Sequence, residues 1–523
     1  MAMNVPRLLV LLAFLAVLGV PLAFRPSGAR LIEDPSAARV VIITPHNEQI
    51  RFEFKRAFER WHEEKYGERV VVDWRQPGGT GEIRKQLESI YRKAVATGQL
   101  IRSESGEWVP APGAAPMAFD LFFGGGSYEH DQAKRGVSAR PPGAEKDEQV
   151  PISMPAGFSQ EQLDAWFGEN VIGALPLYDR DQFWLGNALS GFGIVYNRDV
   201  LSRLGLPEPT SWRDLTDARY SGWLALADPR SSGSVTTTYD SILNNYGWDE
   251  GWRILRAMSA NARYFSNSSP KVPIDVSQGE AAAGVAIDFY GRYQNQAVMR
   301  PGETPETSRV GYIDPPGVVL IDPDPISLLR AGPNPTGARR FIEFLLSEQG
   351  QALWQFHKGA SAQDESGAPI AGPEKYELRR MPIRRVMYEK HRSRFVDTGI
   401  DPFAAASRTP SLGWRSAVAP LMAAFGIETH DDMRRAWEAL NGLKASGRDP
   451  ALAAELEALF HSFPHHTMKD GSKLPVSAEN WSAIRADWRD AQSTGRWNRI
   501  RVEYAEYFRR VYRDITLRAA ARG

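Results

Sequence analysis

Four short loops rich in glycine, serine and threonine each follow a predicted strand and lead into a predicted helix. They are residues 44–48, 78–81, 124–127 and 231–234. A helix N-terminus presents unpaired backbone N–H groups and a partial positive charge. Glycine lets a ligand approach the backbone closely, and hydroxyl side chains add hydrogen-bond donors. The pattern predicts a site for a small polar solute, and an anion or a zwitterion fits it best.

The loops together supply most of the candidate ligand-binding residues. One loop alone is a weak indication, because helix caps use the same residue types. Four loops spread over two predicted α/β units are a better one, since ligands of open parallel sheets lie at the carboxyl ends of the strands. The candidates from the loops are Thr44, His46, Asn47, Glu48, Gly79, Thr80, Gly125, Ser127, Ser231, Ser232, Gly233 and Ser234.

Motifs that would indicate catalysis are missing from the sequence. Residues 78–85 lack the spacing and the Lys-Ser/Thr ending of a P-loop, and His62-Glu63 lacks the second histidine of a zinc protease. No Gly-x-Ser-x-Gly nucleophile motif occurs. For the histidines within residues 461–466, a solvated loop is a simpler interpretation than a metal site. We therefore predict a binding protein, not an enzyme, with no catalytic residues, no cofactor and no metal.

The composition limits the class of protein and its partners. A chain of 523 residues is long enough for two to four domains. Lys plus Arg and Asp plus Glu are equal at 63 each, and this balance argues against a nucleic-acid partner. The chain has no cysteine, which excludes disulfides, thiol nucleophiles, cysteine-based zinc sites and a lipid-modified N-terminal cysteine.

The first residues of the chain resemble an export signal. Arg7 precedes an apolar run from Leu8 to Phe24, an arrangement typical of secretory signals. No clean small-residue cleavage site follows it, so we expect residues 1–24 to be a signal peptide or an N-terminal membrane anchor. A buried helix is the alternative. Either export interpretation places the rest of the chain outside the cytoplasm, in the periplasm or at the cell surface.

Strand and helix patterns alternate through the first three quarters of the chain. Residues 39–44 and 70–74 are predicted strands on either side of a predicted helix at residues 50–66. Such a strand–helix–strand unit requires a parallel sheet with a right-handed crossover. From about residue 400 the pattern becomes helical, with residues 481–519 as one long helix. This C-terminal part completes the second lobe of the fold, forms an arginine-rich arm that docks on an anionic surface, or simply presents its charged face to solvent.

Three stretches have a more specific pattern. Residues 195–233 include Leu-Gly-Leu-Pro-Glu-Pro-Thr-Ser-Trp-Arg-Asp-Leu, residues 279–290 follow a Gly-Glu pair, and residues 322–351 begin with Asp-Pro-Asp-Pro. In this order they resemble the ferric-iron-type branch of the extracellular solute-binding proteins of ABC transporters. The resemblance extends over about residues 39–390.

The resemblance implies an α/β, two-lobed type II periplasmic-binding-protein fold with a mostly helical C-terminal extension. A hinge closes the lobes on a small-molecule solute, and the partner is the transporter permease in the membrane. Lobe 1 would span residues 36–135, completed by part of 300–390, and lobe 2 would span 136–298. Residues 400–523 would form the extension. The protein is expected to be a monomer.

The iron-binding relatives have two adjacent tyrosines a few residues past the Gly-Glu pair. This chain has Asp288, Phe289 and Tyr290 there, so one phenolate is missing. Ferric iron favours hard anionic oxygen ligands, and the substitution weakens the iron interpretation. Asp288 and Tyr290 join the candidate site residues, and with His46 and Glu48 they could still form a site.

We expect the substrate-binding component of an ABC-type importer that captures a small anionic or zwitterionic solute by hinge closure. Three alternatives stay open. They are a ferric-iron-binding transport protein, a membrane-tethered ligand sensor and a hydrolase with its active site in the same cleft.

Overall fold

The structure is a computed structural model, and it describes residues 37–364 and 366–521. The predicted export segment, residues 1–24, lies outside the described residues. No helix in the described part of the chain is both long enough and apolar enough to cross a membrane.

The first lobe is built around the predicted strand–helix–strand unit. β1 (Ala38–Ile43) pairs in parallel with β2 (Val70–Arg75), and α2 (Glu48–Tyr66) connects the two strands. β5 (Leu121–Phe123) pairs in parallel with the other edge of β1. The predicted parallel unit is therefore confirmed, and the carboxyl ends of these three strands lie along one edge of the sheet.

The sequence of α2 explains where the helix begins, which face is buried and where it ends. The side chain of Asn47 caps the helix by accepting a hydrogen bond from the Ile50 N–H. Ile50, Phe54 and Phe58 are spaced by four residues and are buried on one face. Gly67 ends the helix with a φ of 67°, in the left-handed region that glycine adopts without strain.

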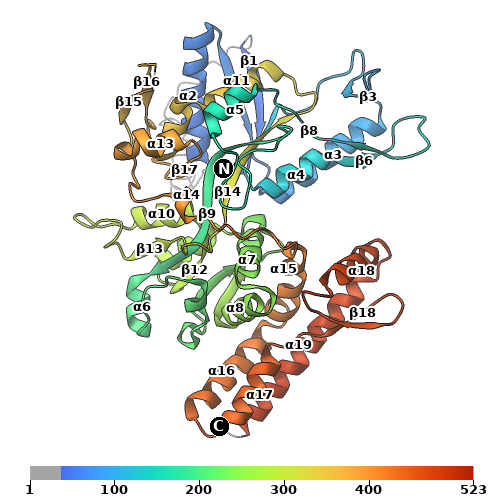
Figure 1. The fold of residues 1–523 in the computed structure, drawn as a ribbon, viewed down its shortest axis with the longest axis vertical. Helices are drawn as coiled ribbons and strands as arrows, with labels where there is room; N and C mark the ends of the chain where they lie inside the picture. The colour runs from blue at the N-terminus through green and yellow to red at the C-terminus, as the bar shows by residue number, and fades with distance from the viewer. Residues whose placement is uncertain (1–36, 365, 522–523) are drawn as a thin grey trace, which may run out of the picture.

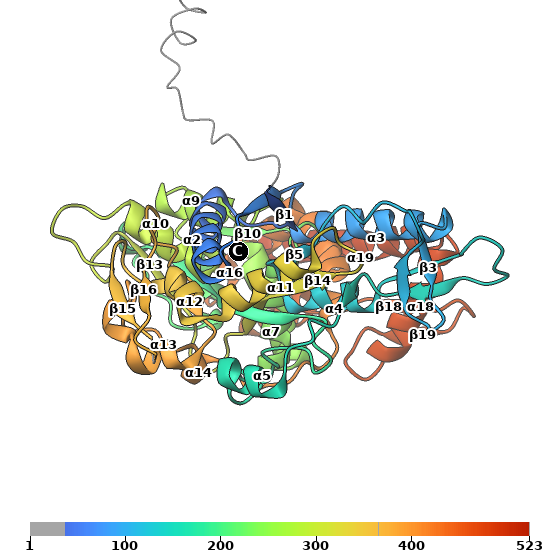
Figure 2. The ribbon, with the colours of Figure 1, turned by 90° about the horizontal axis from the view of Figure 1, so that it is seen from above.

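The other elements of lobe 1 cover its sheet and form its outer hairpins. Figures 1 and 2 show the β3–β4 hairpin and the β15–β16 hairpin at opposite sides of the lobe. The helices are α3 (Thr80–Ala96), α4 (Ser127–Arg135), α5 (Gln160–Phe167), α11 (Pro335–Leu346), α12 (Glu348–Gln355), α13 (Arg385–Lys390) and α14 (Pro402–Ala405). The strands are β3 (Leu100–Arg102), β4 (Trp108–Pro110), β6 (Val137–Ala139), β7 (Glu148–Val150), β8 (Ser153–Met154), β15 (Ser361–Gln363), β16 (Pro369–Ala371) and β17 (Met381–Pro382).

The strands of the second lobe form the other end of the same eleven-stranded sheet. β10 pairs in parallel with β11 and with β12, and β13 lies antiparallel to the strand that enters the lobe. The strands are β10 (Leu224–Ala227), β11 (Ala262–Ser266), β12 (Ala283–Ile287) and β13 (Val310–Ile313). The helices are α6 (Arg198–Leu204), α7 (Gly233–Tyr246), α8 (Trp248–Asn261), α9 (Lys271–Ser277) and α10 (Asp288–Ala297).

Two long strands pass between the lobes and pair with each other. β9 (Leu185–Asn197) and β14 (Ile321–Leu329) are antiparallel, and every residue in them is buried. β9 continues into lobe 2, where it pairs with β12 and β13, whereas β14 continues into lobe 1, where it pairs with β5 and β8. The result is a two-lobed α/β fold with a paired crossing (Figure 1).

The structure moves the predicted boundary between the lobes. Residue 136 was the expected start of lobe 2, but β8 pairs with β14 in the sheet of lobe 1. α5 also buries Leu163 and Phe167 in the core of lobe 1. Lobe 2 therefore begins inside β9. The prediction was wrong because β9 passes from one lobe into the other as a single buried strand, even though its sequence includes Asn187, Ser190 and three glycines.

The C-terminal extension completes the core of lobe 2. Trp252 and Met258 of α8 belong to the same hydrophobic cluster as Phe425, Leu440 and Phe508 of the extension. This agrees with the first interpretation of the helical region, because its helices share a core with the α/β lobe, and Figure 1 shows them next to α7 and α8. The elements are α15 (Arg415–Met422), a π-helical turn at Ala423–Ile427, α16 (His430–Ser446), α17 (Pro450–Phe460), β18 (His465–Thr467), β19 (Lys473–Pro475), α18 (Trp481–Ser493) and α19 (Trp497–Ala520).

Two expectations for the extension were wrong. The predicted helix over residues 481–519 is broken near Gly495, which has a φ of 75° and lets α18 and α19 turn relative to each other. The histidine-rich loop is not simply solvated either. His466 is fully buried, with Nε2 2.8 Å from Asp487 Oδ2 and Nδ1 2.9 Å from the Tyr504 hydroxyl. These contacts fasten the β18–β19 hairpin to α18 and α19.

Arg256 joins α8 of lobe 2 to the extension. It is 1% exposed and donates hydrogen bonds of 2.7 Å to the carbonyls of Phe460 and Ser462, at the end of α17. Its guanidinium carbon lies 4.4 Å from the ring centre of Phe463 and 5.0 Å from that of Phe508. Burial lowers the pKa of Arg256 to about 10.

We predict that Arg256→Ala destabilises the protein by about 2–4 kcal/mol, because it leaves a cavity and two unpaired carbonyls. Hydrogen exchange should then increase in both α8 and the extension. Arg253→Ala is the matched control, since Arg253 is an exposed arginine on the same helix, and it should change stability by less than about 0.5 kcal/mol. Equal effects of the two variants would show that Arg256 does not hold the extension.

Candidate functional site

A cavity of about 690 Å³ lies where the two lobes meet. The four predicted loops all contribute to it, because each one follows a strand of the common sheet and forms the N-terminus of α2, α3, α4 or α7. The predicted site residues that line the cavity are His46, Asn47, Gly79, Thr80, Gly125, Ser231, Ser232, Gly233, Ser234 and Tyr290.

The other four predicted site residues do not line the cavity. Thr44 is fully buried, and its hydroxyl accepts a hydrogen bond from the His46 N–H. Glu48 is an exposed residue in the first turn of α2. The Ser127 N–H donates to Asp322, a bond that caps α4 from a different element.

Asp288 is the fourth predicted residue outside the cavity. It is fully buried at the start of α10, and its carboxylate accepts a hydrogen bond of 3.1 Å from Arg292. Burial raises the pKa of Asp288 to about 7. Its side chain is therefore part of the packing behind the cavity. The four residues considered for an iron site, Tyr290, Asp288, His46 and Glu48, do not come together in one place.

Two carboxylates of β14 line the cavity and were missed from the sequence. Asp322 and Asp324 are two residues apart, and alternation along a strand places both side chains on the same face. Asp324 Oδ2 lies 2.6 Å from a guanidinium nitrogen of Arg380 and 2.9 Å from His46 Nε2, and Asp324 Oδ1 accepts a bond from the Gly125 N–H. The Asp-Pro-Asp-Pro spacing was the signal that could have found them.

Arg380, His46 and Asp324 form a charged cluster at the wall of the cavity. Burial alone would raise the pKa of Asp324, but Arg380 and His46 outweigh it and lower the pKa to about 2. Burial lowers the pKa of His46 in spite of the neighbouring carboxylate. The aspartate and the arginine are thus charged and the imidazole is neutral at neutral pH, so the net charge of the cluster is close to zero.

Asp322 has a different environment, although it is only two residues away. It is 4% exposed, and the hydrogen bond from the Ser127 N–H is the weaker influence. Burial raises the pKa of Asp322 to about 7. Near neutral pH this carboxyl group is therefore partly protonated, and it can donate or accept a hydrogen bond at the cavity.

Arg380 also connects the two lobes. In the chain it lies directly before β17 of lobe 1. Its guanidinium carbon nevertheless lies 4.5 Å from the ring centre of Phe289 on α10 of lobe 2. It also donates to the Ser190 hydroxyl on β9. Phe289, which replaces one of the expected tyrosines, therefore packs against a cation rather than supplying an oxygen ligand.

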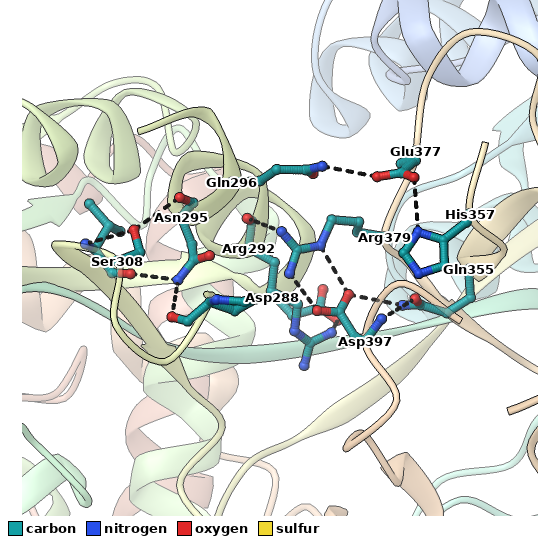
Figure 3. Close-up of polar contacts among 12 residues, drawn as sticks. Asp288, Arg292, Asn295, Gln296, Ser308, Gln355, His357, Glu377, Arg379 and Asp397 are labelled. Atoms are coloured by element: carbon teal, nitrogen blue, oxygen red, sulfur yellow. Dashed lines mark hydrogen bonds and ion pairs between the residues drawn. The ribbon is translucent and has the colours of Figure 1, made fainter. Parts of the chain in front are cut away.

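A polar network bridges the lobes behind this wall (Figure 3). Arg379 has a φ of 54°, which is rare for a residue other than glycine. It pairs with Asp397 and donates to the backbone carbonyl of Arg292 on α10. Beside it, Gln296 of α10 donates to Glu377. The two consecutive arginines thus have different partners at the junction between the lobes. Arg379 belongs to this network, and Arg380 lines the cavity.

No group of three or more histidine, aspartate or glutamate side chains that could hold a metal ion occurs among the described residues. Tyr290 lines the cavity, and burial raises the pKa of its hydroxyl group. The chemistry that the cavity offers is hydrogen bonding from helix N-termini, from hydroxyl groups and from charged side chains of both lobes.

Comparison with known families agrees with this arrangement. Residues 166–375 match the family of bacterial extracellular solute-binding proteins. The matched stretch contains both crossing strands and the whole sheet of lobe 2, and it confirms the family resemblance seen in the sequence. The family is described as extracellular, in agreement with the location outside the cytoplasm that we expect from the sequence.

The chain spans about two fifths of the length of the curated relatives that it matches. The phosphoglycerate transport regulatory protein PgtC of Salmonella typhimurium is 31% identical over 166 residues, which are 32% of this chain and 39% of that protein. An uncharacterized protein of Haemophilus influenzae is 29% identical over 166 residues, 31% of this chain and 44% of that protein.

Solved structures with a similar fold are periplasmic binding proteins. Iron-bound HitA of Pseudomonas aeruginosa is 17% identical, with coverage of 73% of this chain and 96% of that chain and a TM-score of 0.47. AfuA of Actinobacillus pleuropneumoniae, with fructose-6-phosphate bound, is 17% identical, with coverage of 61% and 82% and a TM-score of 0.44.

The raised pKa of Asp322 predicts that the stability of the folded protein depends on pH, because ionising this buried carboxyl group destabilises the folded state. A group with a pKa of about 7 in the folded state and 3.8 as its ordinary value contributes stability below pH 4 that is lost as the pH rises to 7. Asp322→Asn stays neutral throughout. The free energy of unfolding of the wild type should therefore fall relative to this variant between pH 4 and pH 7, by up to about 4 kcal/mol.

Denaturant unfolding at several pH values measures this difference. Asp181→Asn is the control, because Asp181 is a lobe 1 carboxylate with a 69% exposed side chain, and its difference from the wild type should stay nearly constant. A constant difference for Asp322→Asn as well would show that Asp322 is ionised at no unusual cost.

Proposed function

We propose that this protein is the substrate-binding component of an ABC-type importer and captures a small anionic solute between its lobes. The observation that carries the proposal is the cavity at the junction, which is lined by helix N-termini from both lobes in a chain with a solute-binding-protein domain. Hinge motion about β9 and β14 would open and close it. We propose that it binds its solute without turnover and delivers it as a monomer to the membrane permease.

The N-termini of α3 and α7 support an anionic ligand. α3 belongs to lobe 1 and begins at Thr80, and α7 belongs to lobe 2 and begins at Gly233. They lie close together: a Cβ atom placed on Gly233 would be 3.7 Å from Thr80 Oγ1 and 3.3 Å from Glu129 Oε1. An anion held between two helix N-termini would gain from both dipoles and would favour the closed state.

Lysine and arginine side chains at the cavity add positive charge. Lys85 lines the cavity from α3, and in the part of the chain that the structure describes no carboxylate lies within ion-pair distance of it. Arg230 also lines the cavity, but Asp228 pairs with it at 2.7 Å. Lys85 is therefore a cation that a ligand can neutralise.

The relative from Salmonella suggests the class of anion. Its name refers to phosphoglycerate transport. Phosphoglycerate carries a phosphate, a carboxylate and a hydroxyl group, and the cavity offers helix N-termini, Lys85 and the partly protonated Asp322 for them. We propose this solute class, with the ten cavity-lining candidate residues as its contacts.

A ligand panel tests the proposal. We predict that 3-phosphoglycerate or a related phosphate ester raises the melting temperature of the wild-type protein and binds in calorimetry, whereas spermidine and glucose do not. Lys85→Gln should weaken the binding of the phosphate ester by roughly 10-fold, because one charge-assisted contact is lost.

Lys93→Gln is the matched control, since Lys93 is exposed on the same helix and does not line the cavity. Its affinity should equal that of the wild type. Binding of a polyamine alone would contradict the proposal, and so would binding of ferric iron alone. Release of inorganic phosphate from the ester would favour the cleft hydrolase.

The same relative gives a specific reason to consider a second function. Its name describes a regulatory protein of transport, which agrees with a membrane-tethered sensor anchored through residues 1–24. Deletion of the gene in cells that express the permease constitutively distinguishes the two functions. Loss of solute uptake supports the importer, whereas normal uptake with lost induction supports the sensor.

A further inference from the structure

The cavity receives one guanidinium from the C-terminal extension. After α14 the chain leaves lobe 1, and Arg415 is the first residue of α15 and lines the cavity. The extension therefore does more than complete the core of lobe 2, because it also brings a charged side chain to the site.

The segment before Arg415 is fixed along α7. The Ser407 hydroxyl donates a hydrogen bond of 2.7 Å to Asn245, and the Leu412 N–H donates one of 2.9 Å to Asn244. After Arg415, Val418 and Leu421 are fully buried in the shared core of lobe 2. Arg415 is thus positioned from both sides, and α15 lies beside α7 (Figure 1).

Arg415 contacts both lobes. On lobe 2 it donates a hydrogen bond of 2.6 Å to Thr237 Oγ1 and one of 3.0 Å to the Gly233 carbonyl. On lobe 1 its guanidinium carbon lies 4.7 Å from the ring centre of Tyr128, on α4. Tyr128 is 44% exposed, so this stacking is its contact across the cleft rather than part of a core.

The charge of Arg415 is not neutralised by an ion pair among the described residues. Arg380 is paired with Asp324, and Arg230 is paired with Asp228, whereas the Arg415 donors reach a hydroxyl and a carbonyl. The positive charge of Arg415 still acts at the cavity, where it lowers the pKa of Asp322 against the stronger effect of burial. A guanidinium has five N–H donors, and two hydrogen bonds leave three of them for a ligand.

We propose that Arg415 is a ligand-binding residue and that, with Tyr128, it forms a latch that favours the closed state. This rests on the proposed function for the identity of the ligand. An anion between α3 and α7 would accept hydrogen bonds from Arg415, and the same guanidinium would stack on Tyr128 only when the lobes are closed. Ligand binding and closure would therefore stabilise each other, and the extension would be part of the binding site.

Three substitutions test the two roles separately with 3-phosphoglycerate as the probe. Arg415→Gln should weaken its binding by roughly 10- to 100-fold in calorimetry, because hydrogen bonds from a charged donor are lost. Arg415→Lys should recover part of this loss, since the charge stays but the planar fork does not. Tyr128→Leu should weaken binding by only about 2- to 5-fold and should act on the dissociation rate.

Arg408→Gln is the matched control. Arg408 is an exposed arginine in the same segment and does not line the cavity, so this variant should bind like the wild type. Far-ultraviolet circular dichroism should give the same spectrum for every variant, and the partial recovery by lysine shows that a loss in the glutamine variant is not a folding defect.

Small-angle scattering gives a second measurement that needs no ligand. The radius of gyration of the ligand-free wild type should be smaller than that of Tyr128→Leu, because the latch shifts the population toward the closed state. Equal radii would overturn the latch.

The outcomes also separate this inference from the proposed function. If the wild type binds 3-phosphoglycerate and Arg415→Gln binds it equally well, Arg415 is not a ligand-binding residue, but the importer proposal stands. If the wild type binds no anion of the panel, the proposed function fails, and the scattering comparison still decides whether the latch exists.

Discussion

The antiparallel pairing of β9 and β14 joins the two lobes, and the geometry of the cavity between them follows from it. Each strand is shared by both lobes, so this pair fixes how the helices of one lobe lie relative to those of the other. Pro323 and Pro325 lie in β14 where the strands cross, and the pairing register shifts between Asp324 and Pro325. A proline has no N–H to donate, and in a central strand it interrupts the ladder. The ladder is therefore weakest at the junction between the lobes.

The same strand supplies the carboxylates of the cavity. Asp322 and Asp324 alternate with the two prolines, so the prolines face one side of the sheet and the carboxylates face the other. Asp324 is held ionised by Arg380 and His46, whereas Asp322 has a pKa near 7 because burial is not offset by a cation in contact with it. Two aspartates that are two residues apart thus differ in charge because they have different neighbours in the folded structure.

The extension shows how a peripheral region can become part of a site. Its helices bury their apolar faces in the core of lobe 2, and this burial fixes the position at which α15 begins. Arg415, at that position, is brought to the cavity beside the N-terminus of α7. Because the core is common, a substitution deep in the extension would alter the cavity through the placement of α15.

Residue types and their local spacing already specify the local elements and the kind of surface that they present. The apolar runs of β1 and β2, the cap at Asn47 and the four glycine- and hydroxyl-rich loops depend on near neighbours in the chain, so residue type and spacing were enough to predict them. The family resemblance then gave the two-lobed fold. The division between the lobes is visible only in three dimensions, because β9 is one continuous strand that both lobes share. It also decided that Asp288 turns toward Arg292 and that Arg380 and Arg415 reach the cavity. These placements depend on contacts between residues far apart in the chain. An arginine side chain is long and flexible, and the residues next to it in the sequence do not indicate which distant residues it will contact.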